Sequence, residues 1–148
     1  MSTIKTGGCQ CGRVRYRVDV DAAEAYLCHC RMCQKATGGF AAAFVQVPRE
    51  ALTWESEPDR YASSPIADRP FCSHCGTPLG FHYNDNKGRD DLTIGSFDDP
   101  SGFVPSGHYG AESLHEAWID TSGLPRQRSD GTPSVAQRWK NEGLDVPE

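Results

Sequence analysis

The chain has 148 residues with a formal net charge of −5, and only 37% of its residues are hydrophobic. One hydrophobic core usually serves about 100–200 residues, so the length predicts a single domain. Average usage is about 45–50% apolar, so the lower hydrophobic fraction predicts a thin core. The sequence contains no run of about 18 apolar residues and no basic block, so we expect neither a membrane partner nor a nucleic-acid partner.

Short alternating segments predict a mainly β domain built of antiparallel sheets. Residues 13–20 alternate apolar and charged side chains, which is the period of a strand with one buried face. Further apolar or alternating segments predict short strands over residues 40–47, 52–54, 60–62, 79–83 and 92–96. The last two would be joined by a polar turn over residues 84–91, which contains Lys87 and Gly88, and residues 98–110 predict a loop.

Helix signals are few and lie in two places. Residues 32–36 predict one helical turn that ends before Gly38. Near the end of the chain, Thr132 can cap a helix, Pro133 suits its first position, and Gly143 suits the position after its end. Three apolar residues of this C-terminal helix share one face: Val135, Ala136 and Trp139.

The seven cysteines form three groups, a CxC, a CxCxxC and a CxxC motif. An odd number cannot pair fully as disulfides, and the N-terminus lacks the apolar stretch of a secretory signal. We therefore expect a cytoplasmic protein whose cysteines stay reduced. Thiolates two or three residues apart can bind one zinc ion, which prefers four ligands in a tetrahedron. The spacing predicts zinc sites, which would also stabilise a domain with a thin core.

Two of the three motifs end in Cys-Gly, a feature typical of zinc knuckles. Gly12 and Gly76 follow directly after cysteines, and glycine permits the positive φ of a tight turn that points backbone N–H groups at the sulfur atoms. The two knuckles together predict one closed, structural zinc site with four ligands: Cys9, Cys11, Cys72 and Cys75.

The remaining motif consists of Cys28, Cys30 and Cys33, and a possible helix start follows it instead of glycine. Three protein ligands leave a fourth zinc position open, which is typical of a catalytic or ligand-binding site. These three cysteines are therefore the candidate catalytic residues and the candidate ligands of a second, catalytic zinc. The alternatives are that they pack as buried thiols or form a regulatory disulfide, or that His29 or His74 replaces a sulfur ligand.

The chain resembles the glutathione-dependent formaldehyde-activating enzyme family, also called the centromere-protein-V/GFA domain. The likeness lies in four segments: G-G-C-Q-C-G-R-V-R-Y, C-H-C-R-M-C-Q-K-A-T-G-G, F-C-S-H-C-G-T-P-L and L-T-I-G-S-F-D-D-P. It covers about residues 6–125 and implies one domain over residues 1–148, with a C-terminal extension at residues 126–148. It also implies an Mss4-like fold, a structural zinc on the two knuckles and a catalytic zinc on the CxCxxC cysteines.

The family name implies condensation of formaldehyde with glutathione to S-hydroxymethylglutathione, a carbon–sulfur lyase activity in the reverse sense. The expected cofactor is zinc, and the expected partner is a small thiol or aldehyde. Glutathione carries carboxylates, and four residues are candidate cations for binding them: Arg31, Lys35, Arg60 and Arg69. His108 and His115 are candidate acids or bases.

Two readings from other classes compete with the enzyme. A zinc-stabilised, Mss4-like binding module would perform no catalysis, and it has no need of the CxCxxC cysteines as a set. A thiol redox protein, similar to methionine sulfoxide reductases, would need a reactive cysteine outside the metal sites. No such cysteine is left if both zinc sites fill.

Overall fold

The computed structural model describes residues 2–85 and 88–147. The chain divides into two compact units, Met1–His115 and Glu116–Glu148. The first unit is mainly β and contains both groups of cysteines. The expected turn residue Lys87 lies outside the described residues, and no helix in the described part of the chain is long and apolar enough to cross a membrane.

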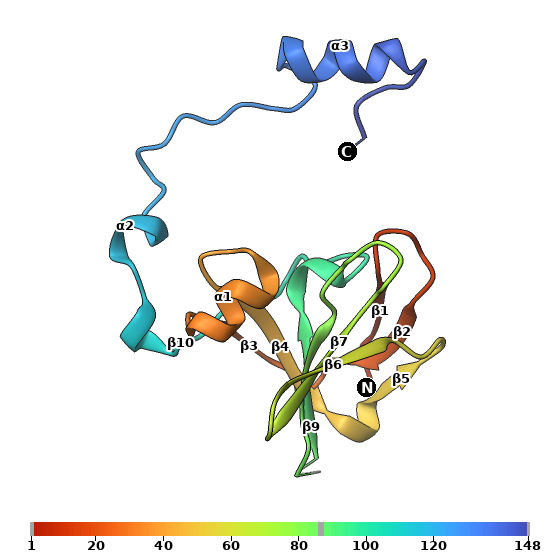
Figure 1. Cartoon of the computed structure of the whole chain (residues 1–148), viewed down its shortest axis with the longest axis vertical. Helices are drawn as coiled ribbons and strands as arrows, with labels where there is room; N and C mark the ends of the chain where they lie inside the picture. Colours follow the sequence, from red (N-terminus) through yellow and green to blue (C-terminus); the bar gives the residue numbers. More distant parts are fainter. Residues whose placement is uncertain (1, 86–87, 148) are drawn as a thin grey trace. The chain divides into compact units, whose positions relative to one another are not determined.

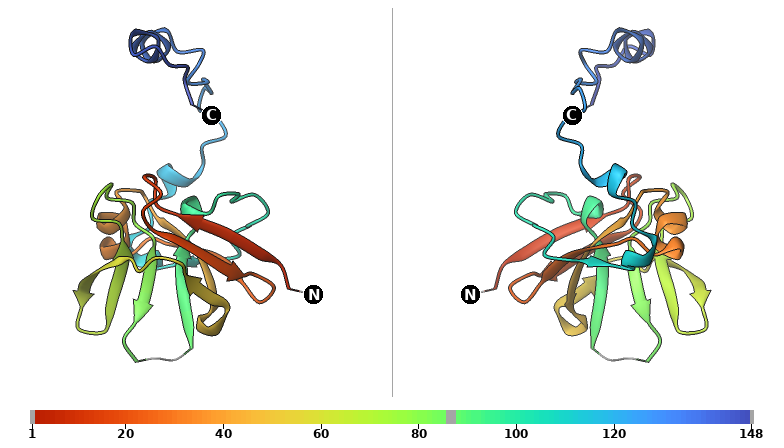
Figure 2. Two further views of the ribbon diagram at one scale, coloured as in Figure 1. Left: turned by 90° about the vertical axis from the view of Figure 1, so that its right-hand side faces the viewer. Right: turned by 90° about the vertical axis from the view of Figure 1, so that its left-hand side faces the viewer.

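The first unit contains two sheets, drawn in Figure 1. The smaller sheet has the order β1-β2-β5, from Ile4–Gly8, Arg15–Asp19 and Leu52–Trp54. The larger sheet has the order β10-β3-β4-β9-β8-β7-β6. Its strands are β3 (Glu24–Cys28), β4 (Ala42–Pro48), β6 (Asp59–Ser64), β7 (Ala67–Phe71), β8 (Gly80–Tyr83), β9 (Arg89–Thr93) and β10 (His108–Tyr109). In Figure 2 the red hairpin of β1 and β2 runs at a steep angle to the green strands of the larger sheet.

The main core fills the space between the two sheets. Tyr16 and Val18 of β2 pack against Val45 and Val47 of β4 and Leu92 of β9, and all five side chains are buried. The Tyr16 ring makes edge-to-face contacts with Trp54 and Phe97, each at a centroid distance of 5.5 Å. The buried Tyr16 hydroxyl is not left unpaired, because it hydrogen-bonds Ser96 Oγ at 2.9 Å.

The opposite face of the larger sheet is also partly covered. Phe44 directly precedes Val45 in β4, so its side chain points away from the main core. It joins a second cluster with Ala42 and Cys33, and Cys33 lies in helix α1 (Arg31–Thr37). Because β4 is covered on both faces, its sequence is a nearly continuous apolar run rather than an alternating one.

Strand register decides which side chains share this second face. Phe44 pairs with Tyr26 of β3, Gln46 pairs with Asp91 of β9, and Asp91 in turn pairs with Phe81 of β8. Directly paired residues in a sheet point to the same side. These five side chains therefore lie on one surface, beside the helix that carries Cys33.

Most of the predicted elements of the first unit are confirmed. Strands β2, β4, β5, β6 and β8 lie within the expected segments or differ from them by one or two residues, and α1 contains the expected helical turn. The prediction of a strand over residues 92–96 is wrong in its bounds. The strand β9 runs over Arg89–Thr93, and Ile94–Ser96 form the 3-10 helix η2. Asp90 and Asp91 are buried in this strand. Because polar residues are typical of turns, the sequence places them in the expected turn and not in the strand.

Four strands have no counterpart in the sequence prediction. Strand β1 ends in two glycines, and neither β1 nor β3 alternates regularly between apolar and polar residues. Strand β7 contains the buried cation Arg69 next to Pro70, so neither the apolar nor the alternating pattern marks it. The expected loop over residues 98–110 ends in the fourth, β10, whose two residues pair with Leu27 and Cys28. This pairing is parallel, whereas the other pairings within the sheets are antiparallel among the described residues.

The second unit contains helices α2 (Glu116–Ile119) and α3 (Pro133–Asn141). Helix α3 confirms the expected C-terminal helix, with Pro133 at its first position and Gly143 at a φ of 72° after its end. Its three apolar residues are half-buried, as their shared face predicts. Thr132 is the N-cap residue, but its hydroxyl donates to the Arg128 carbonyl at 2.9 Å and does not cap the helix.

Candidate metal centres and the adjoining cavity

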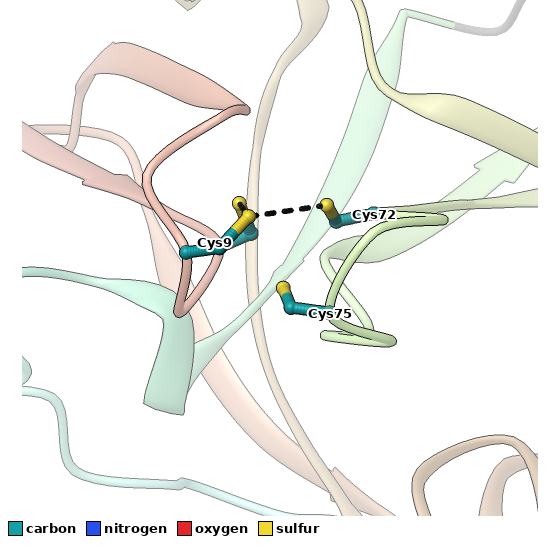
Figure 3. Close-up of side chains that lie close together, drawn as sticks. Cys9, Cys72 and Cys75 are labelled. Atoms are coloured by element: carbon teal, nitrogen blue, oxygen red, sulfur yellow. Dashed lines mark hydrogen bonds between the residues drawn. The ribbon is translucent and has the colours of Figure 1, made fainter.

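Four cysteines meet from two loops, one between β1 and β2 and the other between β7 and β8. Their Sγ atoms all lie within 4.8 Å of one another: Cys9, Cys11, Cys72 and Cys75. Figure 3 shows the sulfur atoms of the two loops turned toward each other. The Sγ atoms of Cys11 and Cys72 are 3.7 Å apart although the residues are 61 positions apart in the chain.

The turns after Cys11 and Cys75 bring these sulfur atoms together. Gly12 and Gly76 have φ values of 81° and 79°, a region that glycine enters without strain. The backbone N–H of Val14 donates to Cys9 Sγ at 3.2 Å, which is the pattern expected for a knuckle.

A cation also faces this four-cysteine group. Arg13 Nε donates to Cys72 Sγ at 3.4 Å, and the guanidinium is ion-paired with Asp59. The Asp59 carboxylate also accepts a hydrogen bond from the backbone N–H of Ser73 at 2.8 Å. The loops that carry the cysteines are thus tied together by ionic and backbone contacts as well as by the sulfur atoms.

The other three cysteines form a second group with Sγ atoms within 4.8 Å of one another: Cys28, Cys30 and Cys33. Cys28 ends β3, and Cys30 is the N-cap of α1, where its Sγ accepts a hydrogen bond from the Cys33 backbone N–H at 3.4 Å. Gly110 closes one side. It has a φ of 61°, and a Cβ there would lie 2.5 Å from the Cys30 nitrogen, so the close approach requires glycine.

A buried cation faces this three-cysteine group too. Arg69 is 7% exposed, its Nη2 donates to Cys33 Sγ at 3.4 Å, and its guanidinium lies 5.0 Å from the centre of the Phe81 ring. A hydrogen bond from Cys28 and the charge of Arg69 lower the pKa of Cys33 to about 5. Of the four cations expected near the site, Arg69 is the one that touches a cysteine of this group.

The other candidate cations serve elsewhere. Arg31 donates to Gln34 at 2.5 Å, Arg60 forms an ion pair with Asp68 at 2.9 Å, and Lys35 is exposed on α1. Lys35 lines a cavity of about 470 Å³ that lies next to the three-cysteine group without including its sulfur atoms.

The histidines do not join either group of sulfur atoms. His29 is 1% exposed, and its Nε2 lies 2.8 Å from Nδ1 of His108 in β10. Burial, together with the facing His108, lowers the pKa of His29. His74 is exposed in the loop between Cys72 and Cys75, and His115 ends the first unit.

A cavity of about 430 Å³ opens directly onto the three-cysteine group. Its walls include the side chains that strand register places on one face of the larger sheet, together with the exposed Tyr109 of β10. The polar wall residue Asp91 accepts hydrogen bonds from the Tyr26 hydroxyl at 2.8 Å and from Gln46 at 3.3 Å. Sequence reasoning missed these wall residues, because their convergence depends on register and not on spacing.

The donor sets fit metal ions. The cysteines are all free thiols, and four close sulfur atoms in one group match the ligand number of a tetrahedral zinc. Three sulfur atoms beside a cavity match a zinc that keeps one position for another ligand. The fold and these two groups define a mainly β protein with two cysteine clusters that can hold metal ions.

The chain belongs to the family described as "Glutathione-dependent formaldehyde-activating enzyme", whose sequence model matches residues 4–113. The match lies within the first unit and ends before residue 125, the limit expected from the sequence motifs. "Uncharacterized lyase C29B12.13" of Schizosaccharomyces pombe is 30% identical over 81 residues. That alignment covers 55% of this chain and 59% of the yeast protein.

A crystal structure of a Rhodobacter sphaeroides protein has a similar fold. The TM-score is 0.53 at 22% sequence identity, over 68% of this chain and 97% of the bacterial one. At this identity the likeness supports the fold.

Proposed function

We propose that the protein is a zinc-dependent, carbon–sulfur lyase-type enzyme that makes or breaks adducts of a thiol and an aldehyde. The observation that carries the proposal is the three-cysteine group at the wall of a cavity, in a chain of the formaldehyde-activating family. The family description and the yeast relative's name support the lyase class. Glutathione and formaldehyde, which form S-hydroxymethylglutathione, are the pair that the family description suggests.

The two groups of cysteines would have different tasks. Cys9, Cys11, Cys72 and Cys75 would hold a structural zinc, and Cys28, Cys30 and Cys33 would hold a catalytic one. When bound, the catalytic zinc would keep a substrate thiol deprotonated at its fourth position.

The chain's own residues would place the reactants. Arg69 would offset part of the negative charge of the thiolates through its contact with Cys33. The cavity walls would restrict the aldehyde and exclude water, and holding both reactants in one place lowers the entropy cost of their encounter. Nothing in this arrangement requires a redox partner, and the two groups together take all seven cysteines, which argues against a redox protein.

The test is exchange at equilibrium between formaldehyde and its glutathione adduct, followed by NMR. The uncatalysed reaction proceeds in water, so endpoint assays would mislead, whereas exchange rates report catalysis directly. We expect the zinc-loaded wild type to speed exchange and Cys30→Ser to lose the effect while keeping its melting temperature. Equal exchange rates in both proteins would rule out catalysis of the glutathione–formaldehyde reaction. Glutathione binding without faster exchange would identify a binding module.

A further inference from the structure

The cavity beside the three-cysteine group has an aromatic wall. Five of its lining residues carry aromatic rings: Tyr26, Phe44, Phe81, Tyr83 and Tyr109. Tyr26 and Tyr109 meet edge to face at a centroid distance of 4.9 Å, and Phe81 and Tyr83 meet in the same way at 4.8 Å. Edge-to-face pairs hold rings in defined orientations, so this wall is a preformed surface for another ring.

The charges at this cavity disfavour a carboxylate. Its charged lining residues are Glu24, Arg69 and Asp91, and Arg69 is already engaged by Cys33 and the Phe81 ring. The cation Lys35 lines the neighbouring cavity instead. The two cavities share Met32, Phe44 and Arg69, so the charged part of a thiol such as glutathione can lie on the Lys35 side while the aromatic cavity stays available.

The volume of the aromatic cavity also favours a ligand larger than formaldehyde. Formaldehyde has no substituent, so it would leave a cavity of about 430 Å³ largely unfilled. Cavities of this kind take ligands that cover their apolar walls, with a few polar groups to orient them. Asp91 and Gln46 are among the polar groups that line this cavity.

We propose that the aromatic cavity holds the ring of an arylalkyl aldehyde, so that the preferred substrate is the adduct of such an aldehyde with a thiol. This inference rests on the proposed function. The thiol sulfur bonds to the carbonyl carbon, and the thiol proton passes to the carbonyl oxygen. The product is a hemithioacetal, and the reverse step breaks the same carbon–sulfur bond. No oxidant or reductant is consumed.

The first experiment varies the aldehyde and keeps glutathione as the thiol. Equilibrium exchange is measured for phenylacetaldehyde and for formaldehyde, each as the acceleration over its own uncatalysed rate. We expect the wild type to accelerate exchange of phenylacetaldehyde at least tenfold more than that of formaldehyde, and Cys30→Ser to accelerate neither.

Two exposed tyrosines provide a matched pair of variants. Tyr109 lines the aromatic cavity and is 61% exposed, whereas Tyr61 lines the neighbouring cavity and is 64% exposed, so removing either ring leaves the buried core intact. Tyr109→Ala should lower the acceleration for phenylacetaldehyde about five- to tenfold, the effect of losing one aromatic contact of roughly 1 kcal/mol. Tyr61→Ala should leave the preference for phenylacetaldehyde over formaldehyde unchanged.

A binding measurement separates the cavity from catalysis. Benzyl alcohol has the ring and an oxygen but no carbonyl, and ligand-observed NMR should detect its binding to both wild type and Cys30→Ser, weakened in Tyr109→Ala. Cys30-dependent exchange of formaldehyde alone, with no binding of benzyl alcohol, would overturn the aromatic proposal and leave the proposed function standing. Absence of Cys30-dependent exchange with both aldehydes would overturn both.

Discussion

The two groups of cysteines use the same ligand chemistry but differ in how they are connected through the chain. The four-cysteine group joins residues 61 positions apart and ties two loops together. The three-cysteine group lies within six residues at the junction of β3 and α1 and opens onto a cavity. A metal ion that closes a long loop removes much of the entropy of the unfolded chain, whereas one that closes a short loop removes little. We therefore propose that the first group stabilises the fold and that the second meets a ligand.

The largest expected effect is on the four-cysteine group. Cys72→Ser, or strong chelation of the wild type, should unfold the first unit, because structural zinc contributes about 10–16 kcal/mol in zinc-finger peptides. Thermal unfolding followed by circular dichroism measures this effect. An unchanged melting temperature after complete metal removal would show that the group does not stabilise the fold.

A second prediction concerns the wall behind the three-cysteine group. Burial raises the pKa of Asp91 from 3.8 to about 6. The folded protein thus binds this proton more tightly than the unfolded chain, and this group's contribution to stability falls as the pH rises from about 4 to about 6. Each pKa unit corresponds to about 1.4 kcal/mol, so Asp91→Asn should raise the free energy of unfolding at pH 7 by about 3 kcal/mol.

Urea unfolding at pH 5 and pH 7 checks this, and the difference between wild type and Asp91→Asn should be smaller at pH 5, where Asp91 is largely protonated in the folded protein. Asp90→Asn is the matched control. Asp90 points to the other face of β9, where it accepts hydrogen bonds from His82 and Arg49, so its loss should lower stability at pH 7. A gain for both variants would show that the effect is not specific to the cavity wall.

Arg69 tests whether the second group needs a nearby cation. Arg69→Met keeps an apolar side chain beside Phe81 but removes the hydrogen bond to Cys33. We expect zinc affinity at the three-cysteine group to fall about 10- to 100-fold, the usual effect of losing a partner of a metal ligand. Competition with a chromophoric chelator measures it. Arg60→Met on the neighbouring strand removes an exposed ion pair with Asp68, and it should leave the affinity unchanged.

The smallest effect on stability is expected for Cys30→Ser. This variant should contain about one zinc equivalent fewer than the wild type, while its melting temperature stays nearly the same, since the group closes no long loop. Metal analysis together with a thermal melt reads both quantities. If Cys30→Ser unfolds as fully as Cys72→Ser, the division of tasks between the two groups is wrong.

The sequence alone determined the grouping of the cysteines and much of the sheet. The glycines after Cys11 and Cys75 predict the two turns, because the positive φ they adopt is a local property of the backbone. The alternation over residues 13–20 and the apolar run of β4 likewise report local burial. Strands with buried polar residues were not predicted or were given wrong bounds, as β7 with Arg69 and β9 with Asp91 show. In a sequence, a polar residue indicates exposure and not burial in a sheet.

Only the tertiary structure decided what surrounds the three-cysteine group. Nothing in the spacing of Tyr26, Phe81 and Asp91 indicates that they share a wall, because that depends on the pairing of β3, β4, β9 and β8. The pairing of β10 with β3 brings Tyr109 to the rim and Gly110 against Cys30. Metal-ligand spacing is local and can be read along the chain, whereas a cavity is made by side chains from distant segments and exists only once the sheet has formed.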